Sequence, residues 1–122
     1  MAELKRLPVK YIRDLAKSDY EKDTECRICG EPDELEFHHY YSVSELYKKW
    51  LKKNKLNSDD VLDHRETFIE EHHKEMYEDT VTLCSFHHNE DLHRIYGRNP
   101  ALGTAKKQMR WVEKQRVKNG LV

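Results

Sequence analysis

Apolar positions recur at helical spacing in five stretches of the chain and alternate with polar ones in two. The helical stretches are about residues 8–20, 42–54, 58–77, 85–96 and 104–118, and the alternating ones are about 35–41 and 79–83. The second alternating stretch contains the β-branched run Thr80-Val81-Thr82, which favours a strand. The pattern predicts a mostly helical α+β protein in which the two strands pair as an antiparallel hairpin.

Capping signals support several of these boundaries. Pro8 is suited to the start of a helix, and Ser42-Val-Ser-Glu45 has the form of a capping box. Gly97 fits the position after a helix, and Thr104 fits the cap of the last one. We therefore expect flanking N- and C-terminal helices around the hairpin, with a two-helix insertion at about 42–78 between its strands.

Composition sets limits on this fold. The 122 residues are 37% charged and 37% hydrophobic, which suits one modest domain (1–122) that a metal ion would help to stabilise. The sequence has no apolar run as long as the ~18 residues of a membrane span, and the N-terminus lacks the apolar region of a secretory signal. We therefore expect no membrane partner and a cytoplasmic location.

Charge is distributed unevenly, although the net charge is only −1. Residues 94–122 contain eight basic residues and one acid, whereas residues 57–79 contain nine acids and two basic residues. Basic residues at the start of helix 104–118 oppose the helix dipole, which suggests an external anion such as a phosphate backbone; a solubilising tail is the alternative. The candidate nucleic-acid-binding residues are Lys106, Lys107, Arg110, Lys114, Arg94 and Arg98.

Three cysteines and one histidine have the spacing of a zinc site. Cys26-Arg-Ile-Cys29-Gly30 has the form of a zinc knuckle, and Cys84 with His87 supplies a second pair of ligands. Redox chemistry and buried free cysteines are the alternatives, but no βαβ pattern surrounds the Cys-x-x-Cys pair. We expect a structural Zn²⁺ held by three thiolates and one imidazole.

Histidines form a second group. Adjacent strand residues point to opposite faces, so His38 and His39 should have different roles. In the hairpin described above, His38, Asp79 and a histidine of helix 85–96 could converge beside His39. His88 and His93 are five residues apart, about 140° around a regular helix, so either His93 contacts substrate or the helix is distorted. The remaining histidines, His64, His72 and His73, fit packing or surface roles.

These pieces resemble the HNH (ββα-metal) nuclease family. The matching residues are CRIC, LEFHHY, DTVTLC and SFHHNEDLH, spread over about residues 24–96, and the size and layout are most similar to small free-standing phage members. The resemblance implies a core of about 24–41 and 79–97, a general base at His39 and a catalytic ion on His38 and His88. Asp79 stands where the family usually has asparagine, and His93 is a further metal-ligand candidate.

The resemblance implies a metal-dependent DNA endonuclease that uses one divalent cation, Mg²⁺ or Mn²⁺ with Ni²⁺ as a further candidate, and leaves 5′-phosphate and 3′-hydroxyl ends. The expected partner is double-stranded DNA, bound by a monomer or homodimer. The alternatives are a zinc-stapled nucleic-acid-binding module without activity and a zinc-structured protein-interaction domain. The irregular spacing of His88 and His93, with Asp79 in place of asparagine, is the main support for the inactive module.

Overall fold

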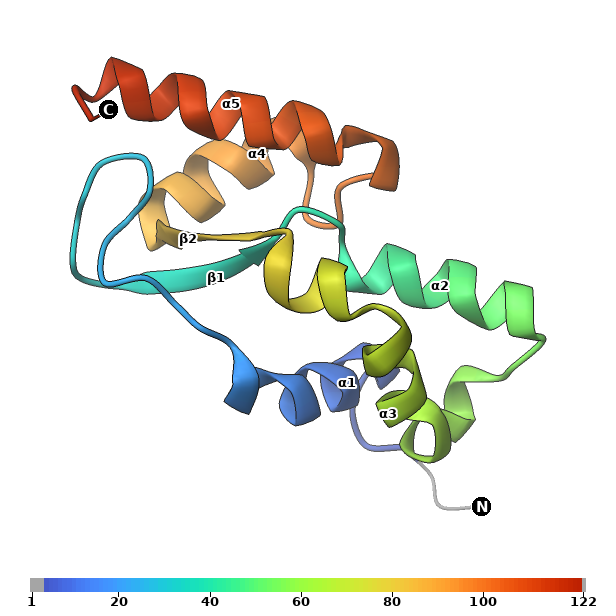
Figure 1. Cartoon of the computed structure of the whole chain (residues 1–122). Coiled ribbons are helices and arrows are strands. Elements are labelled where there is room, and N and C mark those ends of the chain that lie inside the picture. The colour runs from blue at the N-terminus through green and yellow to red at the C-terminus, as the bar shows by residue number, and fades with distance from the viewer. Residues whose placement is uncertain (1–3, 122) are drawn as a thin grey trace.

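The protein folds into two lobes joined through a two-stranded hairpin (Figure 1). The computed structural model describes residues 4–121. Its helices are α1 (Pro8–Ala16), α2 (Val43–Asn54), α3 (Val61–Glu71), α4 (His93–Tyr96) and α5 (Ala105–Lys118), and its strands are β1 (Leu35–His39) and β2 (Thr80–Cys84). Short 3₁₀ turns span Lys17–Asp19, Ser58–Asp60 and Leu102–Thr104, and π-helical turns span Lys74–Glu78 and Phe86–Leu92.

The first lobe, called the helical lobe, is formed by α1, α2 and α3. Its core contains Ile12, Val43, Trp50, Phe68 and Met76, so it buries one face of each helix and of the following π turn. Burial of these apolar faces is the main force that holds the three helices together. In Figure 1 α1 and α3 lie below the hairpin, and α2 lies to its right.

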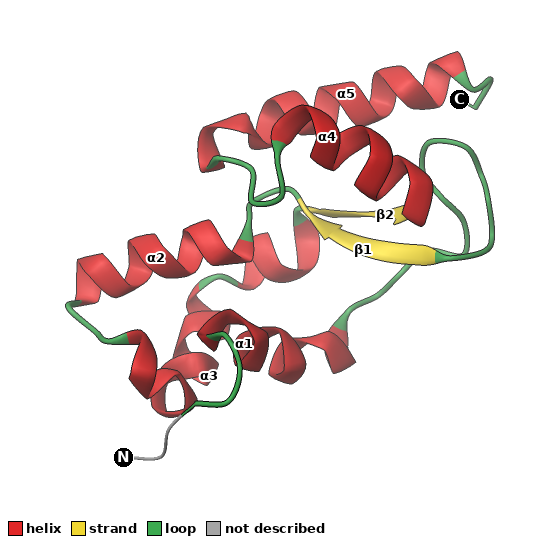
Figure 2. Cartoon of the chain, turned by 180° about the vertical axis from the view of Figure 1, so that it is seen from behind, coloured by secondary structure: helices red, strands yellow, loops and turns green. Residues whose placement is uncertain are grey.

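The second lobe, called the hairpin lobe, contains the loop around Cys26, the two strands, α4 and α5. Its core includes Ile28, Leu83, Leu92 and Val112, each fully buried. Strand β1 pairs with β2 in the antiparallel sense, with His38 opposite Val81. Viewed from behind, in Figure 2, α4 and α5 lie together on the side of the strands away from α1 and α3.

The observed elements agree with the sequence pattern for the mostly helical content, the antiparallel hairpin and the capping of α2, where the Ser42 hydroxyl accepts a hydrogen bond from the Glu45 amide. The helix expected at 58–77 is instead broken at His72, where the backbone leaves helical geometry before the π turn Lys74–Glu78 begins. The helix expected at 85–96 is π-helical over Phe86–Leu92 and α-helical only over His93–Tyr96. Within residues 4–121, no helix has the length and apolar character needed to cross a membrane.

Candidate metal centre and active-site cleft

A cleft of about 520 Å³ opens where the two lobes meet. Strand β1 contributes Phe37, His38 and His39 to its lining, and the helix that follows β2 contributes His88 and His93. The start of α2, the end of α1 and the loop after α4 complete the walls. The histidines that the sequence marks as candidates for catalysis are therefore gathered in one cleft.

Three of these histidines point a ring nitrogen at a common centre. The inward atoms of His38, His88 and His93 all lie within 4.8 Å of one another. Nδ1 of His38 and Nε2 of His93 each lie 3.0 Å from Nε2 of His88. This spacing brings together residues from β1, the π turn and α4, and it is the arrangement of a three-imidazole metal site.

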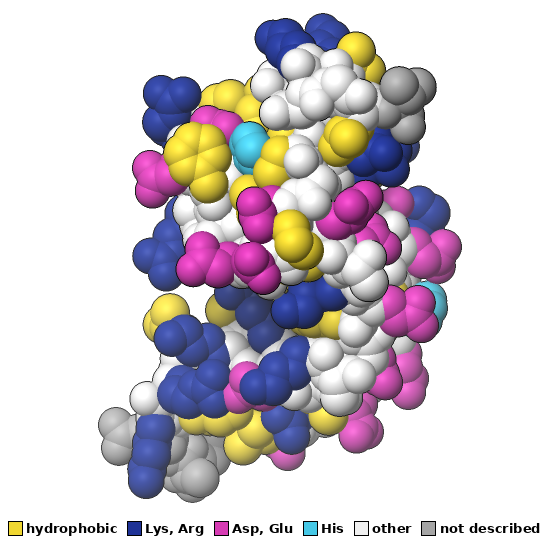
Figure 3. Space-filling model, turned by 90° about the vertical axis from the view of Figure 1, so that its left-hand side faces the viewer, with side chains coloured by type: hydrophobic (Ala, Val, Ile, Leu, Met, Phe, Trp, Pro, Cys, Tyr) yellow, Lys and Arg dark blue, Asp and Glu magenta, His cyan; other side chains and the backbone are white. Residues whose placement is uncertain are grey.

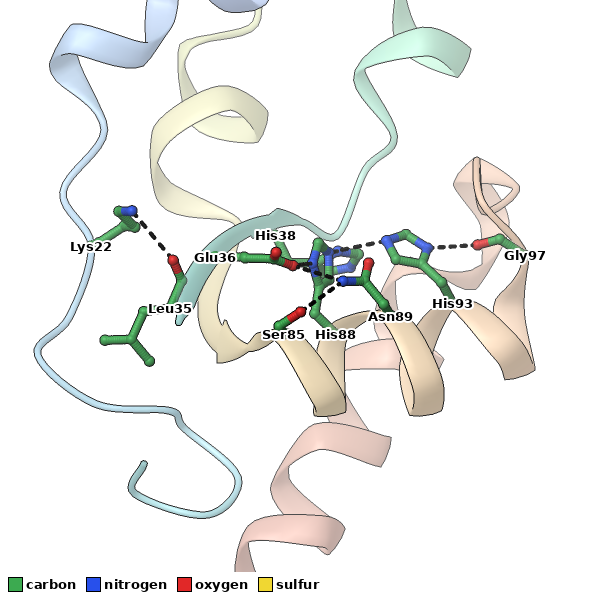
Figure 4. Close-up of polar contacts among 9 residues, drawn as sticks. All are labelled: Lys22, Leu35, Glu36, His38, Ser85, His88, Asn89, His93 and Gly97. Carbon is green, nitrogen blue, oxygen red and sulfur yellow. Dashed lines mark hydrogen bonds and ion pairs between the residues drawn. The ribbon is translucent and has the colours of Figure 1, made fainter. Parts of the chain in front are cut away.

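The outward nitrogen of each imidazole donates a hydrogen bond to a separate acceptor (Figure 4 shows two of these bonds). His88 Nδ1 donates to the Glu36 carboxylate at 2.7 Å, and His93 Nδ1 donates to the Gly97 carbonyl at 2.7 Å. His38 Nε2 donates to the Gln108 side-chain oxygen at 2.8 Å. Outer acceptors of this kind fix the tautomer of a metal-binding histidine.

The hydrogen bonds leave three unprotonated nitrogens facing one another, which fits a cation at their centre. Each neutral imidazole has one N–H group, and in all three rings this group is the one hydrogen-bonded to the outer acceptor. Burial, together with the neighbouring imidazoles, lowers the pKa of His38 to about 3, and desolvation also lowers the pKa of His88. Protonation of these inward nitrogens is therefore unfavourable. Their lone pairs repel one another, and a bound metal ion would remove that repulsion.

The π turn explains how His88 and His93 share a face. In the segment Phe86–Leu92 the backbone bonds span five residues, and the amide of His93 donates to the carbonyl of His88. Residues five apart therefore stand one turn apart, and both side chains reach the cleft. Of the two interpretations that the spacing allowed, the distorted helix is the one observed.

His39 lies on the opposite face of β1 from His38 and outside the three-imidazole group. Its Nε2 donates to the Met76 carbonyl at 3.0 Å, which leaves Nδ1 as the acceptor. Burial, and then the positive charge of Arg13, lowers the pKa of His39 to about 4. Its ring is held by edge contacts with Phe37 and Tyr20. A neutral, oriented imidazole of this kind can accept a proton.

The structure places Asp79 at the end of the hairpin and outside the group of converging imidazoles. Its carboxylate accepts two hydrogen bonds from Lys74, both at 3.0 Å, and its carbonyl accepts one from the Tyr40 amide at 3.2 Å. The group of histidines whose ligand atoms lie close enough together to share an ion consists of His38, His88 and His93, and Asp79 is not part of it. The observed contacts of Asp79 thus close the hairpin directly after His39.

The second group joins Cys26, Cys29, Cys84 and His87. Their ligand atoms also lie within 4.8 Å of one another, with Cys84 Sγ 3.3 Å from His87 Nδ1 and Cys29 Sγ 3.9 Å from Cys84 Sγ. The loop that carries Cys26 is held against β2, because the Arg27 amide donates to the Thr82 carbonyl. Gly30, at φ +78°, completes the turn after Cys29.

This donor set fits a zinc ion by its chemistry. Although burial opposes it, backbone amides that include those of Cys84 and Cys29 hold the pKa of the Cys26 thiol below its usual value. Burial, with the adjacent Cys26 sulfur, raises the pKa of Cys29 to about 11. Without a cation, ionisation of Cys29 beside Cys26 is therefore unfavourable. A bound metal ion would supply the positive charge that keeps both thiols deprotonated.

Of the basic residues expected to bind nucleic acid, most lie outside the cleft and one lies in it. Lys106, Lys107, Arg110 and Lys114 lie exposed on α5, and none of them lines the cleft. Arg94 is exposed and donates to the Glu90 carbonyl, whereas Arg98 lines the cleft. In Figure 3 basic side chains lie at the top of the molecule and in a group at its lower left, and acidic ones lie across the middle and right of the face.

Several site residues were missed by the sequence reasoning. Glu36 could have been found, because it lies two residues before His38 and so on the same face of the strand. Gln108 is fully buried on α5, where a single buried amide among basic residues is a weak signal. Arg13 and Tyr20 gave no signal, since their place in the cleft depends on how α1 packs.

The hairpin, the following helix and the two Cys/His groups thus define a small protein with two candidate metal sites, one of them in a cleft. Residues 2–120 match the sequence profile of the phage T5 Nicking endonuclease family. The chain belongs to this family. It is accordingly a nuclease that acts on DNA. No solved structure matches the chain.

Proposed function

We propose that the protein is a nicking endonuclease of the HNH (ββα-metal) type whose active site is the cleft between the lobes. The observation that supports this most strongly is the convergence of three imidazoles, each with its own outer acceptor, beside a separately oriented His39. Metal-binding and proton-accepting groups are thereby held apart but in one cleft. Hydrolysis of a phosphodiester needs both functions.

His39 acts as the general base in this proposal. The Met76 carbonyl holds the Nε2 proton, so Nδ1 is free to take the proton of the attacking water. The depressed pKa keeps the ring neutral at physiological pH. Asp79 and the π turn Lys74–Glu78 position this base, because the Asp79 carbonyl binds the strand end directly after His39 and Met76 lies in the turn.

His38, His88 and His93 would hold one divalent cation, which would neutralise developing charge on the phosphate and stabilise the leaving 3′ oxygen. Because all three protein ligands are imidazoles, Mn²⁺ or Ni²⁺ fits the donor set better than Mg²⁺, which prefers oxygen ligands. With the water attacking phosphorus and the 3′ oxygen departing, the products carry 5′-phosphate and 3′-hydroxyl ends. The inactive-module alternative loses one of its two supports, since His88 and His93 share a face.

The second site is proposed to hold a structural zinc. Purified protein should retain about one zinc per chain after extensive dialysis, because four protein ligands close a tetrahedral site. Cys84→Ala should lose that zinc and melt at a lower temperature, as measured by elemental analysis and circular dichroism. Wild-type protein that contains no zinc would reject this site.

Cleavage of supercoiled plasmid tests the catalytic proposal. Wild-type protein should convert supercoiled circles to nicked circles when Mn²⁺ or Ni²⁺ is present and should leave them intact in EDTA. His39→Ala should reduce the single-turnover rate by at least ~10²-fold, in line with the usual contribution of a general base, and should change DNA affinity by only a few-fold.

His73→Ala is the matched control, because His73 is exposed and lies outside the cleft. The control should nick DNA at the wild-type rate. Undiminished nicking by pure His39→Ala protein would exclude His39 as the base. DNA binding without cleavage under any metal ion would favour the inactive module.

A further inference from the structure

Two arginines line the cleft from opposite lobes. Arg13 is carried by α1 of the helical lobe, and Arg98 belongs to the loop that follows α4. Both side chains are accessible to solvent. Neither guanidinium has a hydrogen-bond or ion-pair partner among the residues that the structure describes, whereas Arg6 and Arg27 each pair with a carboxylate. These two cations are therefore free to receive an anion.

Arg13 lies near the proposed general base, and Arg98 lies near one of the proposed metal ligands. The positive charge of Arg13 acts on His39, and Arg13 also interacts with the Tyr20 side chain that contacts His39. Arg98 follows Gly97, whose carbonyl accepts the hydrogen bond from His93. Gly97 adopts φ +88°, a conformation that suits glycine, and this turn delivers Arg98 to the cleft.

The electrostatic setting of the pair favours an anion. Desolvation by the surrounding protein, with the charge of Arg98, lowers the pKa of Arg13, so the two guanidinium groups are close enough to repel each other. The chain contains 23 acidic residues, yet no Asp or Glu lines the described cleft. The start of α2, capped by Ser42, also faces the cleft and adds the positive end of its dipole.

We propose that Arg13 of α1 and Arg98 jointly bind one DNA phosphate inside the cleft, which makes the N-terminal helix part of the active site. The inference rests on the proposed function for the identity of the polymer but uses contacts outside the metal ligands and His39. A guanidinium matches a phosphate through two parallel N–H bonds, and two guanidinium groups can share the oxygens of one phosphate. The phosphate replaces solvent between the two cations and removes their repulsion.

The salt dependence of DNA affinity tests the sharing of one phosphate. The variants are Arg13→Gln, Arg98→Gln and the double variant, measured by fluorescence anisotropy without added divalent ion. Each phosphate that a protein neutralises adds about one unit to the slope of log affinity against log salt concentration. The double variant should therefore lose about one unit of slope rather than two. Lys10→Gln is the control, because Lys10 is an exposed cation of α1 outside the cleft.

Single-turnover nicking provides the second readout. Arg13→Gln should slow cleavage by about 10²-fold, comparable to the loss of one preorganised charge donor, and Arg13→Lys should recover part of that loss. Slopes that fall by two units would mean two separate phosphates and would overturn the shared site. An unchanged slope and rate would remove Arg13 from DNA binding altogether. If wild-type protein binds DNA but fails to nick it, the proposed function fails, and the slopes still decide this inference.

Discussion

At the scale of single residues, the candidate metal site depends on acceptors that lie behind the ligands. Gln108 shows this best, because its side-chain oxygen accepts from His38 while its amide donates to the Tyr40 carbonyl and the Thr104 hydroxyl. Every polar atom of this buried amide is used, which fixes its orientation. The same hydrogen bonds fix which nitrogen of His38 faces the centre.

Replacement of Gln108 should therefore weaken metal binding. Gln108→Ala should lower the affinity for Mn²⁺ by roughly 10- to 100-fold, the usual cost of losing an outer acceptor, because His38 can then adopt either tautomer. Isothermal titration calorimetry on zinc-replete protein measures this effect. Gln115→Ala is a matched control on the same helix, since Gln115 lies outside the cleft. Equal affinities in the two variants would show that Gln108 has only a packing role.

Sequence reasoning located the ligand candidates better than it located their surroundings. The pair His38-His39 and the set Cys26, Cys29 and Cys84 could be recognised because local spacing and strand alternation fix where such side chains point. Gln108 lies 70 residues from the histidine that it contacts, and its role follows only from the packing of α5. Local patterns carry no information on contacts of this kind.

At the scale of elements, the π turn Phe86–Leu92 is the feature that assembles the site. Periodicity predicted a helix in this region, but a regular helix would place His88 and His93 on different faces. One extra residue in the turn realigns them, at the cost of less favourable backbone geometry. The break in the helix expected at 58–77 has a related effect, because the π turn after His72 presents the Met76 carbonyl to His39.

The extra residue leads to a prediction about helical register. Removal of the exposed Glu90 should let the segment relax to a regular helix. His88 and His93 would then be four residues apart, and their directions around the helix axis would differ by about 40°. Affinity for Mn²⁺ should then stay within about tenfold, because residues four apart on a helix are neighbours. Insertion of one alanine after Glu90 should abolish binding, since the six-residue spacing fits neither helix. Tight binding by the insertion variant would contradict this account.

At the scale of the whole molecule, the proposed active site depends on the contact between the two lobes. The three-imidazole group belongs to the hairpin lobe, whereas Arg13 comes from the helical lobe, and the cleft exists only where they meet. The basic face of α5, formed by Lys106, Lys107, Arg110 and Lys114, lies outside this cleft. The molecule thus separates groups that could act on one phosphodiester from groups that could hold neighbouring parts of the DNA.

This separation predicts that the basic face of α5 sets affinity and leaves the chemical step unchanged. Combined substitution of Lys106, Lys107, Arg110 and Lys114 by glutamine should weaken DNA binding for all sequences, because phosphate contacts carry no base information. The salt slope of affinity should fall by about one unit for each phosphate contact that is lost. At saturating protein concentration the single-turnover nicking rate should equal that of the wild type.

The matched comparison is an equal change of charge on α2, in which Lys48, Lys49, Lys52 and Lys53 are replaced by glutamine. These lysines are also exposed and also lie outside the cleft. If α5 is the helix that holds DNA, the α2 variant should keep most of the wild-type slope. A larger loss in the α2 variant would move the DNA path to the helical lobe. A reduced nicking rate at saturation in the α5 variant would mean that these four side chains act on the chemical step, although none of them lines the cleft.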